Sequence, residues 1–318
     1  MGRRAMTKGV LCSGSIVFDT LVRPVENPQW GTTTFVETIE SHVGGNGANT
    51  SVALATIGTD VRLLGAVGRD EQGHFLLESL QRAGVDTHAV TLMSEPTAAS
   101  IVMVNSAGDR KFLHRVGASA TAFTAPVKFT PELTAGIAHY HLASLFILPN
   151  LRKHAPETLC RARAAGLITS LDTNWDPESR WMQDLAPCLP HLDIAFLNED
   201  EARMATGTAE PCKAAEFLLD RGVRMAVLKL GARGCAIYTG SDEILCPAFD
   251  VEAKDTTGAG DCFVAGFLAA LLRGTSLAEA GAFANAVAAF SVQTLGGVAG
   301  VRSYGEIQAW MRTARFKS

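Results

Sequence analysis

Two hydrophobic patterns follow one another along the chain. Up to about residue 125, several segments alternate polar and apolar side chains, which is typical of strands with one face in water. These segments are Thr33–Ile39, Ser100–Val104 and Lys111–His114, the last of which follows a turn at Ser106–Asp109. The alternation predicts a small, exposed β-sheet.

Between and after these segments, apolar strand candidates are followed by helical patterns. The predicted strands are Val61–Val67, Ile168–Asp172, Ile194–Asn198 and Met225–Leu230, and the predicted helices are Gly73–Ala83, Pro156–Ala165, Glu199–Thr206 and Pro211–Arg221. Strands that alternate with helices indicate a mostly parallel sheet covered on both faces, in the α/β class. Ligands bind beyond the carboxyl ends of such strands, so Asp172, Asn198 and Lys229 become site candidates, with solvated loop residues as the alternative.

Composition restricts the class of partner. The 318 residues are 47% hydrophobic and carry a formal net charge of −4, without any run of five like charges. We therefore expect a small-molecule partner and no nucleic acid or membrane. The uncharged stretch from Ala280 to Val301 contains Asn285 and several glycines, so we interpret it as a buried helix followed by a turn. No repeat or linker divides residues 1–318, which predicts a single domain.

The N-terminus and the cysteines predict a compartment. A basic cluster at Gly2–Lys8 precedes an apolar segment that is too short for a signal peptide, and it leads into a first strand. The seven cysteines are scattered and form no CxxC pair. Both features predict a cytoplasmic protein with reduced thiols.

The strongest chemical signal lies between Lys254 and Leu272, where a glycine-punctuated turn leads into an apolar helix. Gly258, Ala259 and Gly260 open this helix, and Asp261 falls in its first turn. Free backbone N–H groups and the positive end of the helix dipole predict an anion hole there. A carboxylate beside bound phosphate suits a base that deprotonates an attacking hydroxyl. The alternative is an ordinary capping aspartate.

Other motifs narrow the chemistry. The sequence contains no Walker A motif, no GxGxxG before a helix, no GxSxG and no HExxH. His139 and His141 share one face of a predicted strand, but no further ligand completes a metal set, so we expect packed histidines. A second glycine cluster, Gly44-Gly45, leads into another small-residue helix. Asn46 and Asn49 near its start offer donors and acceptors suited to sugar hydroxyls, or else they cap and pack the helix.

These two clusters resemble the signature motifs of the PfkB, or ribokinase-like, carbohydrate kinases. The resemblance covers nearly the whole chain. It implies a central, mostly parallel sheet flanked by helices, with a small β-sheet lid whose strands lie at about 16–42 and 96–118. It also implies a homodimer formed through the lid. In this family an aspartate after the first strand binds sugar hydroxyls, which corresponds to Asp19, and Gly44 and Gly45 correspond to the lid hinge. Asn46 and Asn49 correspond to substrate contacts.

The same resemblance assigns the nucleotide side. Asn198 and Glu201 match an Asn-x-x-Glu motif that holds Mg²⁺ and phosphate through water, and both offer the oxygen ligands that Mg²⁺ prefers. Unaided, the same residues predict the N-terminus of a helix. The other positions implied by the resemblance are Lys229 at the ATP phosphates, Gly231 and Gly234 in the nucleotide turn, Asn285 beside adenine, and Asp255 with the Gly296-Gly297 turn at a monovalent cation (K⁺) position.

The resemblance implies direct transfer of the ATP γ-phosphoryl group to a primary sugar hydroxyl, with Asp261 as the base. The stretch Asp172-Thr173-Asn174 looks more like that of fructokinases and 2-keto-3-deoxygluconate kinases than that of ribokinases. Ala143–Leu148 also lacks a carboxylate that ribokinases carry. Both features favour a hexose or keto-sugar bound through Asp172 and Asn174. A nucleoside kinase with Phe18 or Phe112 against a base, and a catalytically silent sugar- or nucleotide-binding regulator, are the alternatives.

Overall fold

The computed structural model describes residues 8–317, so most of the basic N-terminal cluster lies outside the described residues. The strands are β1 Gly9–Ser13, β2 Val17–Arg23, β3 Thr38–Gly44, β4 Val61–Gly68, β5 Val90–Met93, β6 Ala99–Val104, β7 Arg110–Arg115, β8 Ile137–Leu142, β9 Ile168–Asp172, β10 Ile194–Asn198, β11 Met225–Lys229, β12 Cys235–Thr239 and β13 Glu243–Cys246. The helices are α1 Asn46–Ile57, α2 Glu71–Arg82, α3 Pro131–Thr134, α4 Pro149–Ala164, α5 Met182–Leu185, α6 Glu199–Thr206, α7 Pro211–Leu219, α8 Ala259–Leu272, α9 Leu277–Val292 and α10 Tyr304–Met311.

Nine strands form the central sheet, in the order β13-β12-β11-β10-β9-β8-β1-β4-β5. All neighbouring pairs from β11 to β5 are parallel, and only β12 runs against its neighbours. The apolar strands β9, β10 and β11 lie side by side, so their last residues Asp172, Asn198 and Lys229 meet at one edge of the sheet. This confirms the predicted α/β architecture.

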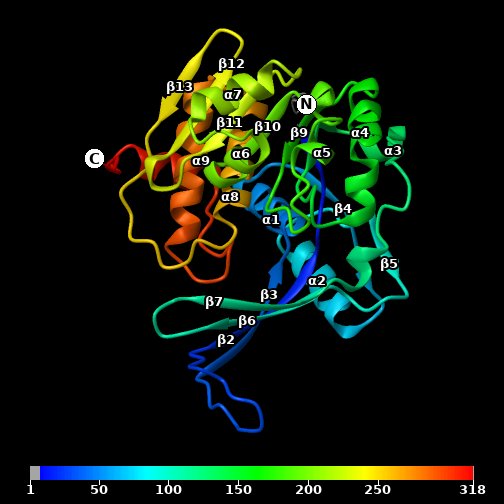
Figure 1. Cartoon of the computed structure of the whole chain (residues 1–318), viewed down its shortest axis with the longest axis vertical. Coiled ribbons are helices and arrows are strands. Elements are labelled where there is room, and N and C mark those ends of the chain that lie inside the picture. Colours follow the sequence, from blue (N-terminus) through cyan, green and yellow to red (C-terminus); the bar gives the residue numbers. More distant parts are fainter. Residues whose placement is uncertain (1–7, 318) are drawn as a thin grey trace, which may run out of the picture.

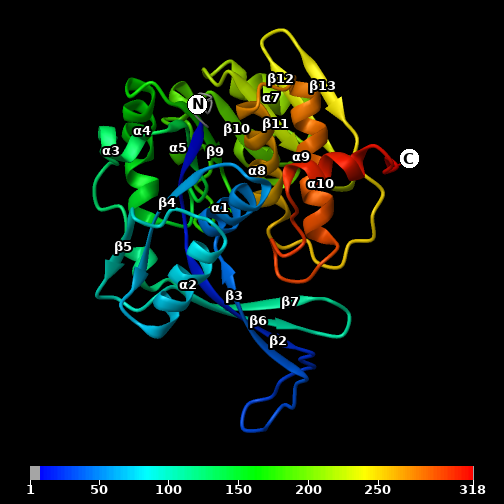
Figure 2. The same ribbon diagram turned by 180° about the vertical axis from the view of Figure 1, so that it is seen from behind.

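Helices cover both faces of this sheet (Figures 1 and 2). One core cluster joins the sheet to α1, α2, α8, α9 and α10, and a second joins the opposite face to α4, α6 and α7. A layer of helices on each face of the sheet buries both faces of the central strands, which explains why these strands are continuous apolar runs. The uncharged stretch after Ala280 forms the buried end of α9 and a turn, and no helix among residues 8–317 is both long and apolar enough to cross a membrane.

A separate four-stranded sheet, in the order β3-β2-β6-β7, forms the lid (Figure 1). Its strands come from two distant segments, because β2 pairs with β3 on one side and with β6 on the other. The lid lies across the same end of the body as the α1 and α8 N-termini, and the loop between β2 and β3 projects far beyond it. β2, β6 and β7 lie within the two segments proposed for the lid, whereas β3 begins in the first segment and runs beyond it to Gly44.

Two predicted elements were wrong in their bounds. The alternating segment at 33–37 is an exposed loop, because β2 ends at Arg23 opposite Thr38 and the following Pro24 has no N–H to extend the ladder. The helix predicted to begin at Pro156 begins at Pro149, which occupies its first turn, and Pro156 lies inside it. The other predicted strands and helices agree with the structure to within two residues.

Candidate active site

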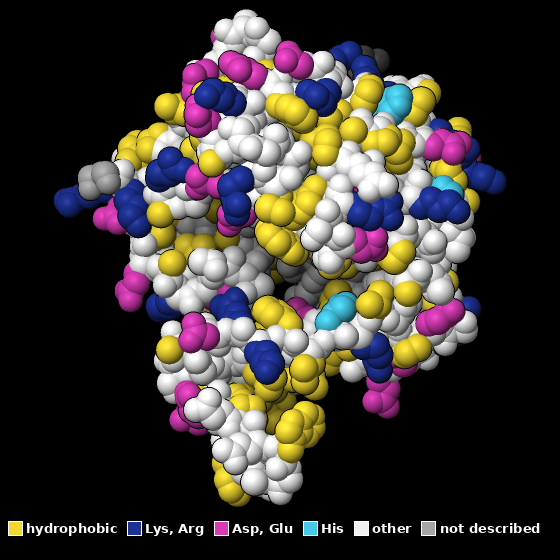
Figure 3. Space-filling model, in the orientation of Figure 1, with side chains coloured by type: hydrophobic (Ala, Val, Ile, Leu, Met, Phe, Trp, Pro, Cys, Tyr) yellow, Lys and Arg dark blue, Asp and Glu magenta, His cyan; other side chains and the backbone are white. Residues whose placement is uncertain are grey.

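Two cavities meet at the N-terminus of α8, in the hollow between lid and body that Figure 3 shows. The cavity on the body side has a volume of about 370 Å³ and is bounded by the turn after β11, the start of α8 and the last turns of α9. The cavity on the lid side is bounded by inward side chains of the lid, by α1 and by the Asp255–Thr257 turn. The first residues of α8 therefore separate two places in which molecules can bind.

The N-terminus of α8 carries no side-chain cap, and its Ala259 N–H donates to the Thr256 carbonyl at 3.3 Å. Gly258 stands before the helix in the left-handed conformation, with φ of 70°, which a residue with a side chain adopts at a cost. No side chain caps the first turn of α8, whereas α6, α9 and α10 each begin with a capping box. Gly260 leaves room beside the Lys229 ammonium, since a Cβ there would lie 3.3 Å from Nζ. An uncapped helix N-terminus is a suitable place for an anion, so the anion hole stays a prediction that this geometry permits.

Asp261 lies at the centre of the arrangement and does not cap its helix. Its two carboxylate oxygens accept hydrogen bonds from the side chains of Asn46 (3.0 Å) and Asn49 (2.9 Å), which project from the start of α1. The side chain is 5% exposed. Burial raises the pKa of Asp261 to about 7, against the lowering effect of the two asparagine hydrogen bonds. A carboxyl group with such a pKa is suited to accept a proton near neutral pH.

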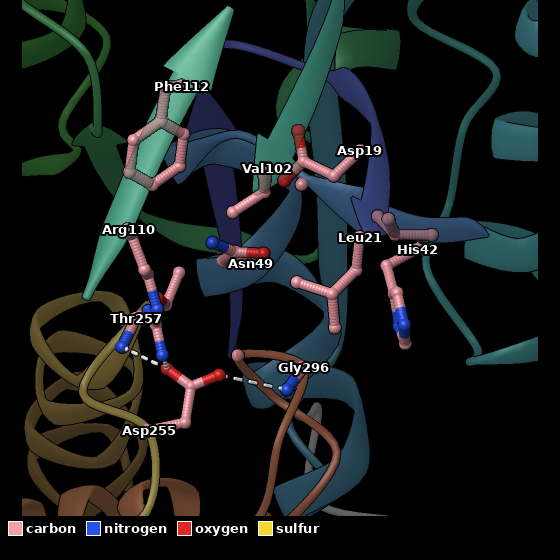
Figure 4. Close-up of a pocket in the computed structure, with 13 residues that line it drawn as sticks. Asp19, Leu21, His42, Asn49, Val102, Arg110, Phe112, Asp255, Thr257 and Gly296 are labelled. Atoms are coloured by element: carbon pink, nitrogen blue, oxygen red, sulfur yellow. Dashed lines mark hydrogen bonds and ion pairs between the residues drawn. The ribbon is translucent and has the colours of Figure 1, made fainter. Parts of the chain in front are cut away.

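The lid provides the opposite wall (Figure 4). Leu21, Val102 and Phe112 stand in register on adjacent strands and line the lid-side cavity together with Asp19. Gly44 makes room for the Asp19 carboxylate, because a Cβ at this glycine would lie 1.9 Å from Oδ2. Burial raises the pKa of Asp19, which Ser100 and His42 partly offset.

Arg110 connects the lid to the body. Its guanidinium lies 2.6 Å from Oδ1 of Asp255, which also accepts the backbone N–H of Thr257 at 2.7 Å. Oδ2 of Asp255 accepts the N–H of Gly296 at 3.1 Å. Although burial alone would raise the pKa of Asp255, these hydrogen bonds hold it below its usual value. Sequence reasoning missed Arg110, since a basic residue at the start of an exposed strand carries no local signature.

A buried charged network lies beside the N-terminal turn of α8. The Lys229 ammonium donates to both oxygens of Asp172, at 2.8 and 2.7 Å, across the carboxyl ends of β9 and β11, which lie on either side of β10. Burial opposes the charge of Lys229, but Asp172 and Glu201 overcompensate and raise its pKa. The chain thus gives the ammonium a carboxylate partner, while Lys229 still lines the body-side cavity.

Asn198 and Glu201 form the capping box of α6. Asn198 Oδ1 accepts the Glu201 N–H, and Glu201 Oε2 accepts the Asn198 N–H, both at 2.8 Å. Glu201 Oε2 also accepts the Thr173 hydroxyl at 3.1 Å. The purely structural expectation for this motif is confirmed. These hydrogen bonds use only Oε2 of the buried Glu201 carboxylate, so the motif is compatible with holding a metal ion through water. Burial raises the pKa of Glu201.

The remaining nucleotide-side candidates gather in the body-side cavity. Gly231 and Gly234 both have left-handed backbones, with φ of 57° and 96°, in the turn between β11 and β12. Asn285 lines the cavity and donates its Nδ2 to the carbonyls of Cys246 (2.9 Å) and Pro247 (3.1 Å), which joins α9 to the end of β13.

Other candidates lie elsewhere. Asp172 and Asn174, like Asn46 and Asp261, are not among the residues lining either cavity; Asn174 has a φ of 51° and accepts the Phe146 N–H at 3.4 Å. His139 and His141 both hydrogen-bond Ser170, at 2.6 and 2.8 Å, and no cluster of metal-binding side chains occurs in residues 8–317.

Comparison with known proteins agrees with this geometry. Residues 7–303 match the pfkB family of carbohydrate kinases. The chain is 29% identical to probable fructokinase-5 of Arabidopsis thaliana, over 85% of this chain and 88% of the relative. It is 30% identical to aminoimidazole riboside kinase of Salmonella typhimurium, over 80% and 82% of the two chains. The structure of Arabidopsis thaliana ribokinase complexed with ribose and ATP superimposes with a TM-score of 0.83, at 25% identity, over 96% of this chain and 99% of the other. Since the family match spans most of the sequence, the chain belongs to the pfkB family of carbohydrate kinases.

Proposed function

We propose that the protein transfers the γ-phosphoryl group of ATP to a primary hydroxyl of a small sugar held under the lid, with Asp261 as the catalytic base. The observation that carries this proposal is the position of Asp261, which lies in the first turn of an uncapped helix whose start separates the two cavities, with a pKa of about 7. A protein that only binds sugar or nucleotide has no use for such a base.

The residues divide the reaction between them. Asp19 and Asn49 are placed to bind hydroxyls of the acceptor on the lid side, Asn46 holds the Asp261 carboxylate, and the glycine turn at Gly231–Gly234 admits the nucleotide on the body side. Asp261 takes the proton of the attacking sugar hydroxyl. The oxygen of that hydroxyl bonds to the γ-phosphorus, and the bond between the γ-phosphorus and the ADP oxygen breaks. The amides of Gly258–Gly260 stabilise charge on the phosphoryl group in flight, and lid closure excludes water.

Mg²⁺ fits the donors of this site. Glu201 and Asn198 present oxygens at the carboxyl edge of the sheet, next to the body-side cavity, and Mg²⁺ favours oxygen ligands with most of its waters retained. These two residues would hold the ion through water, where it would neutralise charge on the nucleotide phosphates. Lys229 holds a further positive charge beside Gly260 through its pairing with Asp172.

For the acceptor we propose a hexose or keto-sugar in preference to ribose. The similarity to a probable fructokinase supports this, as does the Asp172-Thr173-Asn174 stretch. A nucleoside is the second candidate, favoured by one observation: Phe112 faces the lid-side cavity, where a base could stack on its ring. Phe18 is less suited, since its ring packs edge-on against Phe75 at 5.2 Å.

A coupled assay of ADP release tests the proposal over hexoses, keto-sugars, 2-keto-3-deoxy sugar acids, pentoses and nucleosides with Mg-ATP. We expect one class to give saturable turnover, and Asp261→Asn to reduce kcat by about 10²- to 10⁴-fold while leaving sugar binding largely intact. Near-normal turnover in that variant would refute the mechanism, and an absence of ADP release with every acceptor would refute the kinase assignment.

We also propose a cytoplasmic homodimer formed through the lid. The outer face of the lid carries Ile39, Ile101 and Leu113, which are 69%, 44% and 52% exposed. Ile101 and Leu113 are opposite each other on paired strands, and neighbouring residues of the same strands point into the cavity. An apolar sheet face of this kind is suited to pair with a second copy. Light scattering should show a dimer that Ile101→Lys converts to a monomer.

A further inference from the structure

The ion pair between Arg110 and Asp255 joins the lid to the active-site turn (Figure 4). Arg110 is the first residue of β7, the edge strand of the lid, and its side chain is 19% exposed. The Asp255 side chain is 6% exposed and accepts two backbone N–H groups, from Thr257 and Gly296. A buried carboxylate thus holds two loops together and receives its only countercharge among the described residues from the lid.

The environment of Asp255 does not fit the monovalent cation that the family resemblance implied. Both carboxylate oxygens already accept hydrogen bonds, and a guanidinium lies 2.6 Å from Oδ1. A second cation in contact with the same oxygen would be repelled by the guanidinium, and this repulsion is weakly screened where both groups are largely removed from water. A guanidinium also brings its own directed donors, so it needs no further oxygen ligands.

We propose that Arg110 supplies the positive charge at Asp255 in place of a monovalent cation, and so couples lid closure to the turn that carries Gly258. This inference rests on the proposed kinase function. Asp255 accepts the N–H of Thr257, which immediately precedes Gly258 at the start of α8. The positive charge of Arg110 keeps the Asp255 carboxylate in place, and this carboxylate in turn keeps the turn before α8 in the position where the phosphoryl group is stabilised. Arg110 acts through Asp255 and is a positioning residue.

The arrangement links substrate enclosure to preorganisation. When the lid moves away from the body, Arg110 moves with β7 and leaves the Asp255 carboxylate with its two backbone N–H donors but without a countercharge, which is unfavourable. Closure restores the countercharge and orders the turn at the same time. A mobile K⁺ would neutralise Asp255 whether or not the lid were closed, whereas a tethered guanidinium does so only in the closed state.

The first experiment needs no variant. ADP release by the wild-type protein is measured in potassium, sodium and tetramethylammonium chloride at constant ionic strength, with Mg-ATP and the best acceptor. We expect kcat to agree within about twofold across the three salts, because the charge at Asp255 is already supplied. A rise of about fivefold or more in K⁺ relative to tetramethylammonium would overturn the proposal.

The second experiment compares Arg110→Met, Arg110→Lys and the control Lys111→Met, which removes an exposed charge from the next position of the same strand. In tetramethylammonium, Arg110→Met should lose about 10- to 100-fold in kcat with a smaller change in KM for ATP, and K⁺ should restore about tenfold of it. Arg110→Lys should keep most of the activity, and Lys111→Met should match the wild type. If Arg110→Met matches Lys111→Met in every salt, the proposal fails.

A readout independent of turnover separates this inference from the proposed function. K⁺ should raise the melting temperature of Arg110→Met, because the Asp255 carboxylate of this variant has no countercharge and can bind K⁺. The melting temperature of the wild type should not change with K⁺. A wild-type protein that is stabilised by K⁺ and not by tetramethylammonium contradicts the inference. If no acceptor supports ADP release, the proposed function fails while the melting experiment still decides the role of Arg110.

Discussion

Replacing Asp261 by asparagine should stabilise the protein in alkaline solution while it strongly reduces turnover. The pKa of the buried carboxyl group is about 7, against an ordinary value of 3.8. The folded state therefore retains a proton that the unfolded state has lost between these two pH values, and the free energy of unfolding falls as the pH rises through that window. Above about pH 7 the full cost of about 4 kcal/mol is present, at about 1.4 kcal/mol per pKa unit.

The size of the effect can be estimated at two pH values. At about pH 8.5 the asparagine variant escapes the whole cost, whereas at about pH 5 it escapes less than half of it. Asparagine offers one oxygen where the carboxylate accepts from both Asn46 and Asn49, so one hydrogen bond worth about 1 kcal/mol is lost at pH 8.5, where Asp261 is ionised, and not at pH 5, where Asp261 is protonated. The net stabilisation is then about 3 kcal/mol at pH 8.5 and about 2 kcal/mol or less at pH 5.

Differential scanning calorimetry measures this difference directly. For a chain of this size, about 2 °C per kcal/mol converts the estimate to an increase of about 6 °C in Tm at pH 8.5 and about 4 °C or less at pH 5. Asp220→Asn, at an exposed aspartate, is the matched control and should show the same small change at both pH values. An Asp261→Asn variant that is less stable than the wild type at pH 8.5, or equally shifted at both pH values, would refute the argument from burial.

Three further outcomes follow from other contacts. The same pKa of about 7 predicts that kcat/KM falls about tenfold per pH unit below pH 7, because protonated Asp261 cannot accept a proton; a flat profile down to pH 5.5 would contradict it. Gly266→Ala should lower the free energy of unfolding in urea by about 1–3 kcal/mol, because its Cβ would lie 2.7 Å from Cγ2 of Val287, where α8 packs on α9. An unchanged midpoint of urea unfolding would show that the two helices can move apart without cost. Arg152→Met should cost about 3–5 kcal/mol, because it leaves the fully buried carboxylate of Asp176 without its partner, and Asp176→Asn in the same background should recover part of the loss.

Elements with strong local signals were predicted well. Apolar runs fixed β4, β9, β10 and β11 to within a residue, and the helix at 199–206 was predicted with its actual bounds. The failures occurred where a local pattern lacked a tertiary partner. The alternating residues 33–37 form no strand because β2 has ended opposite them, and a proline that suggested the start of α4 lies inside that helix.

The candidate site shows the same division. Glycine spacing placed Gly258–Gly260 and Asp261 at the start of a helix, which is a local property of about ten residues. The sequence left the capping alternative open for Asp261, and the structure decided it through Asn46 and Asn49, more than 200 positions away along the chain. The pKa of Asp261 likewise depends on burial that no window of sequence contains.

By itself, the sequence determined the α/β class, the two glycine motifs and the kind of chemistry they support, because periodicity, turn residues and helix starts depend on neighbours along the chain. Only the tertiary structure decided which charges face one another. It paired Asp172 with Lys229, whose strands are separated by β10, and it brought Arg110 of the lid to Asp255 of the body. Such contacts depend on how whole layers pack, and a carboxylate written in the sequence does not show whether a substrate, a metal ion or an arginine will neutralise it.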